Sequence, residues 1–175
     1  MIVYSDTRQQ QGKHRNIEEF CRRKGIELRT VTLKTGDYTT DPIDYKITVD
    51  TKQGLKEVYC NLIGHREHER FKRECIRAQD AGIRLIVLVE ERGIGSLKEV
   101  KNWANPRIIQ YDELRLAHLH GKLLHKPLPK APPVSSERLM NIMRTMSERY
   151  GVEWQFCDPK DTGKRIVEIL YGVTL

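Results

Sequence analysis

Two acidic residues and a lysine form the pattern in this sequence that is best suited to chemistry. Asp50 and Lys52 lie two residues apart in a segment, 45–52, in which apolar and polar residues alternate. Side chains two apart on a strand point to the same face, so a carboxylate and an ammonium group are expected side by side at a strand edge. Asp37 lies in the preceding turn-rich stretch, 36–44, and a hairpin of this length would bring it alongside Asp50.

Such a group of side chains suits the hydrolysis of a phosphodiester. Two carboxylates held together repel each other, and a hard divalent cation such as Mg²⁺, or Mn²⁺ in its place, relieves the repulsion. A bound ion lowers the pKa of a water molecule, and a nearby lysine stabilises the charge that builds up on the phosphate. An Asp-x-Lys triplet is common, however, and without the turn that carries Asp37 it would be more typical of a solvated surface strand.

The balance of charge indicates an anionic partner. The chain has 175 residues, and its 31 Lys and Arg residues against 24 Asp and Glu residues give a formal net charge of +7. A basic protein of this kind attracts polyanions, nucleic acid first, although a solvated basic surface without a partner remains the alternative.

Four arginines add a local basic feature. They follow one another at helical spacing, so they form one stripe of a predicted helix. The stripe is either a ridge that contacts phosphates or a solvated face with ion pairs, such as Glu69 with Arg73 and Arg70 with Glu74. A smaller basic patch is expected around Lys13. The arginines of the stripe are Arg66, Arg70, Arg73 and Arg77.

The order of elements predicts a mixed α/β domain with a central sheet flanked by helices. The continuous apolar run 85–89 is typical of a strand buried on both faces, and segments 26–33 and 45–52 are expected to pair antiparallel. Four prolines between residues 126 and 134 indicate an exposed linker. Predicted strands are residues 1–4, 26–33, 45–52, 85–89, 107–111 and 152–157. Predicted helices are residues 16–24, 55–81 with a break near Gly64, 96–103, 112–124, 135–150 and 161–170.

The chain is expected to be cytoplasmic. No apolar run approaches the length of about 20 residues that spans a bilayer, and the first six residues turn polar too early for a signal peptide. The four cysteines form no Cys-x-x-Cys pair and are interpreted as reduced thiols.

Three short motifs resemble those of one nuclease family. Asp6-Thr7-Arg8, Gly36-Asp37-Tyr38 and Asp50-Thr51-Lys52 are similar, in this order, to the D-x-R, G-D-Y and E-R-K elements of XPF-type structure-specific endonucleases. These belong to the PD-(D/E)XK superfamily, which has a restriction-endonuclease-like fold. The late strand 152–157 and the helix after it also fit, so the resemblance covers most of the chain. Residues of about 92–133 would then be an insertion within a single domain, 1–175.

The resemblance implies roles for particular residues. Asp6, Asp37 and Asp50 would ligate Mg²⁺ or Mn²⁺, Lys52 would lie beside the ion, and Arg8 would lie near the phosphate. It implies action on branched or flapped DNA, a homodimer, and a role in DNA repair or recombination. Stand-alone members of this kind occur in phages and prophages, so the expected location is the cytoplasm of a bacterial or phage-infected cell.

The sequence also departs from the family pattern. The family glutamate is Asp50, the family arginine is Thr51, and the glutamate that follows Arg8 in the family is Gln9. The acidic residue expected at the start of the next helix is matched by Glu57 only after a shift of one position. Three alternatives therefore stand beside an active XPF-like nuclease: a catalytically inactive DNA-binding or scaffold subunit, a junction-resolvase-like or restriction-type nuclease of the same superfamily, and a nuclease directed at RNA.

Overall fold

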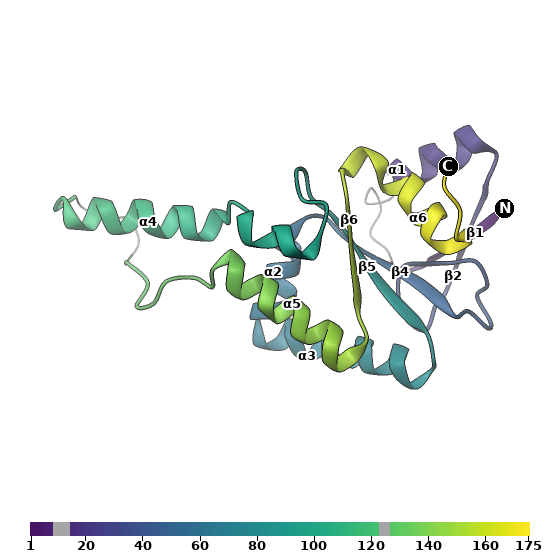
Figure 1. Ribbon diagram of the computed structural model, residues 1–175, viewed down its shortest axis with the longest axis horizontal. Coiled ribbons are helices and arrows are strands. Elements are labelled where there is room, and N and C mark those ends of the chain that lie inside the picture. Colours follow the sequence, from purple (N-terminus) through teal and green to yellow (C-terminus); the bar gives the residue numbers. More distant parts are fainter. Residues whose placement is uncertain (9–14, 123–126) are drawn as a thin grey trace.

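Six strands form one mixed sheet within residues 1–8, 15–122 and 127–175, which the computed structural model describes (Figure 1). The strand order is β2-β1-β3-β4-β5-β6. β1 pairs parallel with β2, β3 pairs antiparallel with both β1 and β4, and β4, β5 and β6 are parallel. The strands are β1 (Ile2–Asp6), β2 (Glu27–Val31), β3 (Tyr38–Thr39), β4 (Ile47–Lys52), β5 (Arg84–Glu90) and β6 (Glu153–Cys157).

The predicted antiparallel pairing of segments 26–33 and 45–52 is wrong. β3 occupies the edge of β4, with Tyr38 opposite both Ser5 and Val49. β2 instead returns beside β1 after a helical crossover, and such crossovers join parallel strands. A strand of two residues leaves too short a pattern to be recognised within a turn-rich stretch.

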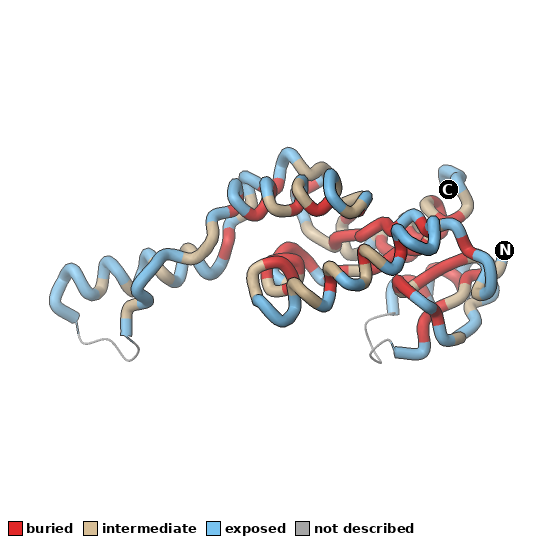
Figure 2. The backbone as a smooth tube through the Cα atoms, turned by 90° about the horizontal axis from the view of Figure 1, so that it is seen from below, coloured by how far each residue is buried: buried red, intermediate tan, exposed pale blue. Residues whose placement is uncertain are grey.

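Helices cover both faces of the sheet, which places the core in two layers. α2, α3 and α5 pack on the face that carries Leu85, Val87 and Val89, and α1 and α6 pack on the opposite face against Val49 and Leu88. Figure 2 shows both layers as buried backbone around the strands. No helix of the described ranges is long and apolar enough to cross a membrane. The helices are α1 (Arg15–Lys24), α2 (Leu55–Ile63), α3 (His65–Asp80), α4 (Pro106–Leu119), α5 (Ser136–Tyr150) and α6 (Thr162–Tyr171), with short 3₁₀ turns at Leu97–Asn102 and Pro159–Asp161.

Several predicted elements are confirmed. β5 is buried on both faces over residues 85–89, and the helix predicted over 55–81 is broken at Gly64, whose backbone is extended. Ser135 caps α5, because its side chain accepts a hydrogen bond from Arg138 N. The fold is therefore the predicted one, a mixed central sheet flanked by helices.

The segment between β5 and α5 differs from the prediction. The strand expected over residues 107–111 and the helix expected from residue 112 are one helix, α4, because Asn105 accepts a hydrogen bond from Arg107 N and Pro106 occupies the first turn. The helix expected over residues 96–103 is a 3₁₀ turn. α4, all of whose residues are described, buries none of its side chains, and it projects away from the sheet (Figures 1 and 2).

Candidate active site

Asp50 and Lys52 share one face of β4, as their spacing predicts. Lys52 Nζ lies 2.5 Å from Asp50 Oδ2, and the two side chains are only 11% and 7% exposed. α3 closes over them, since the Lys52 ammonium lies 5.8 Å from the centre of the Phe71 ring. The pair is thus enclosed between the sheet and the helix layer.

A second Asp-x-Lys triplet in the same chain shows how unusual this enclosure is. Asp44 and Lys46 also form an ion pair, at 2.7 Å, but their side chains are 77% and 70% exposed. The pKa of Asp44 is lowered by its hydrogen bond to Lys46, as for an ordinary surface pair. The same spacing therefore produces a solvated pair at one position and an enclosed pair at the other.

Burial changes the protonation of the enclosed pair. Loss of water around the carboxyl is the largest effect on Asp50, and together with the charges of Asp37 and Glu74 it raises the pKa of Asp50 to about 7 against the opposing effect of the Lys52 ammonium. Burial alone would lower the pKa of Lys52, but the charge of Asp50 outweighs this and raises it, so the lysine stays charged. Asp50 Oδ2 contacts the Lys52 ammonium but accepts no hydrogen bond of good geometry from a described residue. Extra positive charge near this oxygen would favour the ionised carboxylate.

Gly36 allows Asp37 to reach the site. Its φ of +73° lies in the left-handed region, and a Cβ atom there would be 2.0 Å from Thr48 Oγ1. The next residue is then held between two strands, because Asp37 N donates to Val49 O at 2.8 Å and Asp37 O accepts from Asp6 N at 2.9 Å. The glycine before the aspartate is therefore required by close packing.

Thr51 fixes the Asp37 carboxylate. Asp37 Oδ2 accepts hydrogen bonds from Thr51 N at 2.8 Å and from Thr51 Oγ1 at 2.7 Å. The charge of Asp37 also raises the pKa of both Asp50 and Lys52, so the three predicted residues lie within electrostatic reach of one another. Thr51, which departs from the family arginine, acts here as a positioning residue.

Glu74 is an acidic residue of the site that the sequence analysis missed. Its Oε1 accepts hydrogen bonds from Gly36 N at 3.2 Å and from Thr35 Oγ1 at 3.3 Å. Its charge raises the pKa of Asp50. The signal was present in the sequence: Glu74 lies three residues after Phe71, and thus on the flank of α3 that faces the sheet.

Asp6 and Arg8 are paired with each other. Asp6 accepts four hydrogen bonds, from Arg8 N, Nε and Nη2 and from Leu33 N, at 2.6–2.9 Å. Burial would raise the pKa of Asp6, but these bonds outweigh it and lower the pKa. The guanidinium of Arg8 is 63% exposed on its side chain and also binds Leu33 O. The backbone of Asp6 contacts Asp37, because Asp6 N donates to Asp37 O, whereas the Asp6 carboxylate binds Arg8 and Leu33 N.

The four arginines of the predicted stripe lie together on the exposed face of α3. The ion pairs proposed as the alternative are not formed among the described residues, because Glu69 lies near Lys72 and Glu74 binds the loop at Thr35 and Gly36. The face is thus open to an anionic partner. Lys13 lies outside the described residues.

The donor atoms at this site fit a hard divalent ion held by few protein ligands. Within the described ranges, no three His, Cys, Asp or Glu side chains form a ready-made metal cluster. Mg²⁺, however, is commonly held by one or two carboxylates and completes its shell with water and substrate phosphate. The buried Asp50 carboxylate and the half-buried Asp37 carboxylate would supply those oxygens, and Lys52 would have to move from Asp50 Oδ2 for that atom to bind the ion. Asp6 would first have to give up its bonds to Arg8 and Leu33.

The arrangement of this sheet and its helices is also found in solved structures of other proteins. No family model matches the chain, and no curated protein is similar to it in sequence. Eight chains of solved structures are similar in fold. One is XPF from Aeropyrum pernix, with a TM-score of 0.59 and 19% sequence identity over 97% of this chain. The match spans 63% of that protein, and at this identity it shows an XPF-like fold.

Proposed function

We propose that this protein is a metal-dependent DNA endonuclease. The observation that carries the proposal is the enclosed Asp50–Lys52 pair at 2.5 Å, beside Asp37, on an XPF-like fold. Burying an ion pair costs free energy that a surface pair does not, so retention of the two charges supports a functional role. The XPF-like motifs supply the reaction: hydrolysis of a phosphodiester.

Each residue of the candidate site would have a separate role in this reaction. Asp37 and Asp50 would hold Mg²⁺ or Mn²⁺, which when bound supplies an activated water and neutralises charge on the phosphate. Lys52 keeps its proton, since the charge of Asp50 raises its pKa, and donates hydrogen bonds to the water or to the phosphate oxygens. Thr51 orients Asp37, and Glu74 holds the turn that carries it.

The exposed arginines of α3 would contact the phosphate backbone. None of the four forms an ion pair with another described residue, so each is available to a DNA phosphate. Arg8, exposed beside Asp6, would add a contact closer to the scissile bond. Branched or flapped duplex as the substrate, and a homodimer as the active form, are proposed on the resemblance to XPF-type endonucleases alone.

One feature of the site favours a second function. Asp50 and Lys52 neutralise each other in an enclosed space, and the described residues hold no ready three-ligand metal cluster. In a nuclease-like scaffold that binds DNA without cutting it, such a pair would stay closed. The two functions differ in whether the pair opens to a metal ion and a phosphate.

A cleavage assay separates these functions. Wild type would be incubated with labelled duplex, flap, fork and four-way-junction DNA and with matched RNA, in Mg²⁺, Mn²⁺ or EDTA. Asp50→Ala would be compared with Asp44→Ala, which removes the aspartate of the exposed triplet. Metal-dependent cutting of DNA that Asp50→Ala abolishes and Asp44→Ala keeps supports the nuclease, and the panel identifies its substrate. DNA binding without cutting supports the scaffold, and cutting of RNA alone refutes the DNA assignment.

A further inference from the structure

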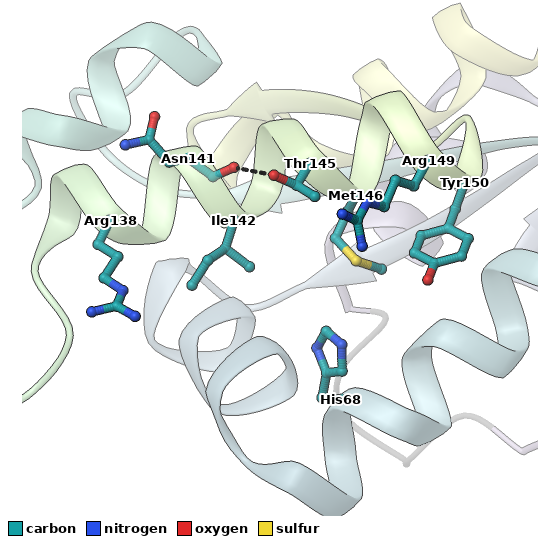
Figure 3. Close-up of a pocket in the computed structure, with 8 residues that line it drawn as sticks. All are labelled: His68, Arg138, Asn141, Ile142, Thr145, Met146, Arg149 and Tyr150. Atoms are coloured by element: carbon teal, nitrogen blue, oxygen red, sulfur yellow. Dashed lines mark hydrogen bonds between the residues drawn. The ribbon is translucent and has the colours of Figure 1, made fainter.

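A groove lies between α3 and α5, on the helix layer that also covers the candidate active site. It encloses about 300 Å³ and runs along α5, with His68 of α3 as its opposite wall (Figure 3). Arg138 lies at one end and Arg149 and Tyr150 at the other, and the apolar side chains of Ile142 and Met146 lie between them. No carboxylate lines it among the described residues.

The charged groups of the groove have no partner within the described chain. Neither Arg138 nor Arg149 forms an ion pair or a side-chain hydrogen bond with a described residue. His68 Nδ1 is buried and has no hydrogen-bond partner there. Buried polar atoms are nearly always paired, so the described chain leaves one polar atom unsatisfied in the wall of this groove.

The arrangement of these groups selects the chemistry of the ligand. Arg138 and Arg149 are eleven residues apart on one helix, which separates their Cα atoms by about 16 Å. One small anion would not engage both ends, so the ligand carries repeated negative charges. Ile142, Met146 and the Tyr150 ring offer an apolar platform between the charges, and bases stack on such surfaces.

We propose that this groove binds a single strand of nucleic acid, with phosphates at the two arginines and an unstacked base over Tyr150. A hollow of about 300 Å³ is at the small end for ligand pockets. The hollow therefore has room for one unstacked base, while the strand that carries it runs along α5 from one arginine to the other. A peptide of acidic residues alone, such as polyglutamate, would match the charges but has no ring to stack on the apolar platform. The inference rests on the proposed function for the identity of the strand as DNA.

The position of the groove connects it with the chemistry. Lys52 lies over Phe71, the Phe71 ring lies 6.0 Å from the Trp154 ring, and Trp154 Nε1 donates to Met143 O of α5. The Phe71 and Trp154 rings thus connect Lys52 with α5, the helix that carries most of the groove. A single-stranded arm in the groove would leave a neighbouring duplex on the arginine face of α3, which suits a branched substrate.

Binding of a fluorescent twelve-nucleotide oligothymidine, measured by anisotropy at several KCl concentrations in EDTA, tests the proposal without any cleavage. The Arg138→Ala/Arg149→Ala variant is expected to lose at least tenfold in affinity, and the slope of log K against log salt should fall by about 1.4, from 0.7 per phosphate contact. Arg22→Ala/Lys24→Ala removes two exposed charges from α1, on the other face of the sheet, and should leave both values unchanged.

A second variant tests the apolar platform. Tyr150→Ala should weaken binding of the oligothymidine by about fivefold or more while leaving the salt slope unchanged, because stacking is lost and phosphate contacts remain. Thermal unfolding of each variant would show that the fold is kept. Equal binding by wild type and the double arginine variant would overturn the proposal, and so would equal binding of polyglutamate and the oligothymidine to wild type. A wild type that binds but does not cut would refute the nuclease and leave the groove standing.

Discussion

Thr51→Val tests whether Thr51 positions the Asp37 carboxylate. Valine has nearly the same shape as threonine but lacks the hydroxyl that donates to Asp37 Oδ2 at 2.7 Å, while the backbone bond from residue 51 at 2.8 Å remains. The variant therefore removes one of the two donors to this oxygen. Asp37 would turn more freely, and the proposed metal ligands would no longer be held in place.

The size of the effect follows from the contacts. A hydrogen bond to a charged group contributes about 1.5–3 kcal/mol, and the low end applies because a second donor to the same oxygen remains. A loss of about 1.5 kcal/mol lowers the melting temperature of a chain of this length by roughly 3–6 °C. Loss of a residue that orients a metal ligand typically weakens metal affinity by about 10- to 100-fold.

Two measurements check this prediction. Thermal unfolding in EDTA gives the loss of stability, and cleavage against Mg²⁺ concentration gives the metal dependence. Thr51→Ser keeps the hydroxyl and should behave like wild type in both. If Thr51→Val needs no more Mg²⁺ than Thr51→Ser, the threonine does not position a metal ligand, and the reasoning from its hydrogen bond to Asp37 is refuted.

Three further predictions concern protonation, the DNA face and the projecting helix. The pKa of Asp50 is about 7 in the folded protein against an ordinary 3.8, so the folded state binds this proton more tightly. The resulting stability is present below about pH 4 and is lost as pH rises through about 7. Urea unfolding in EDTA should therefore show that the unfolding free energy of wild type falls on the order of 4 kcal/mol relative to that of Asp50→Asn between these limits. Curves of unfolding free energy against pH that run parallel for the two proteins would contradict a buried carboxyl. Arg70→Ala/Arg73→Ala should lower the salt slope for duplex DNA by about 1.8, and an unchanged slope would exclude α3 as a phosphate-binding face. Replacing residues 108–132 with Gly-Ser-Gly should change the melting temperature little, because α4 buries no side chain. The two ends of the replaced segment are already held together, since Asn105 Nδ2 donates to Val134 O at 3.1 Å. Loss of cooperative unfolding would show that residues 108–132 belong to the core.

Local periodicity was sufficient to predict much of the fold. The continuous apolar run became β5, buried on both faces, and the glycine at position 64 divided α2 from α3. Strand β3 was missed because its pairing with β1 and β4 is determined by tertiary contacts. The two isoleucines at positions 108 and 109 favoured a strand, whereas the capping asparagine and the proline before them started a helix.

The site shows the same division between local pattern and tertiary contact. The spacing of Asp50 and Lys52 predicted their common face, but an identical spacing at Asp44 and Lys46 gave an exposed pair. The difference comes from Phe71 on α3, which covers only the Asp50–Lys52 pair. Phe71 lies 19 or more residues beyond both triplets, so the local sequence around them could not supply it. Glu74 was missed because a glutamate four residues after an arginine reads as an ion pair until the loop beside the helix is known.

The most direct test of the proposed centre is the single-turnover rate of DNA cleavage in Mg²⁺ by Lys52→Ala and Lys46→Ala, with DNA binding measured in parallel. Lys52→Ala should cut at least about 100-fold more slowly than wild type, as expected when one group that stabilises charge in the transition state is lost. Lys46→Ala should cut at the wild-type rate, and both variants should still bind DNA. Equal cleavage rates for the two variants, or cleavage by wild type that persists in EDTA, would contradict a metal-dependent centre built on Asp37, Asp50 and Lys52.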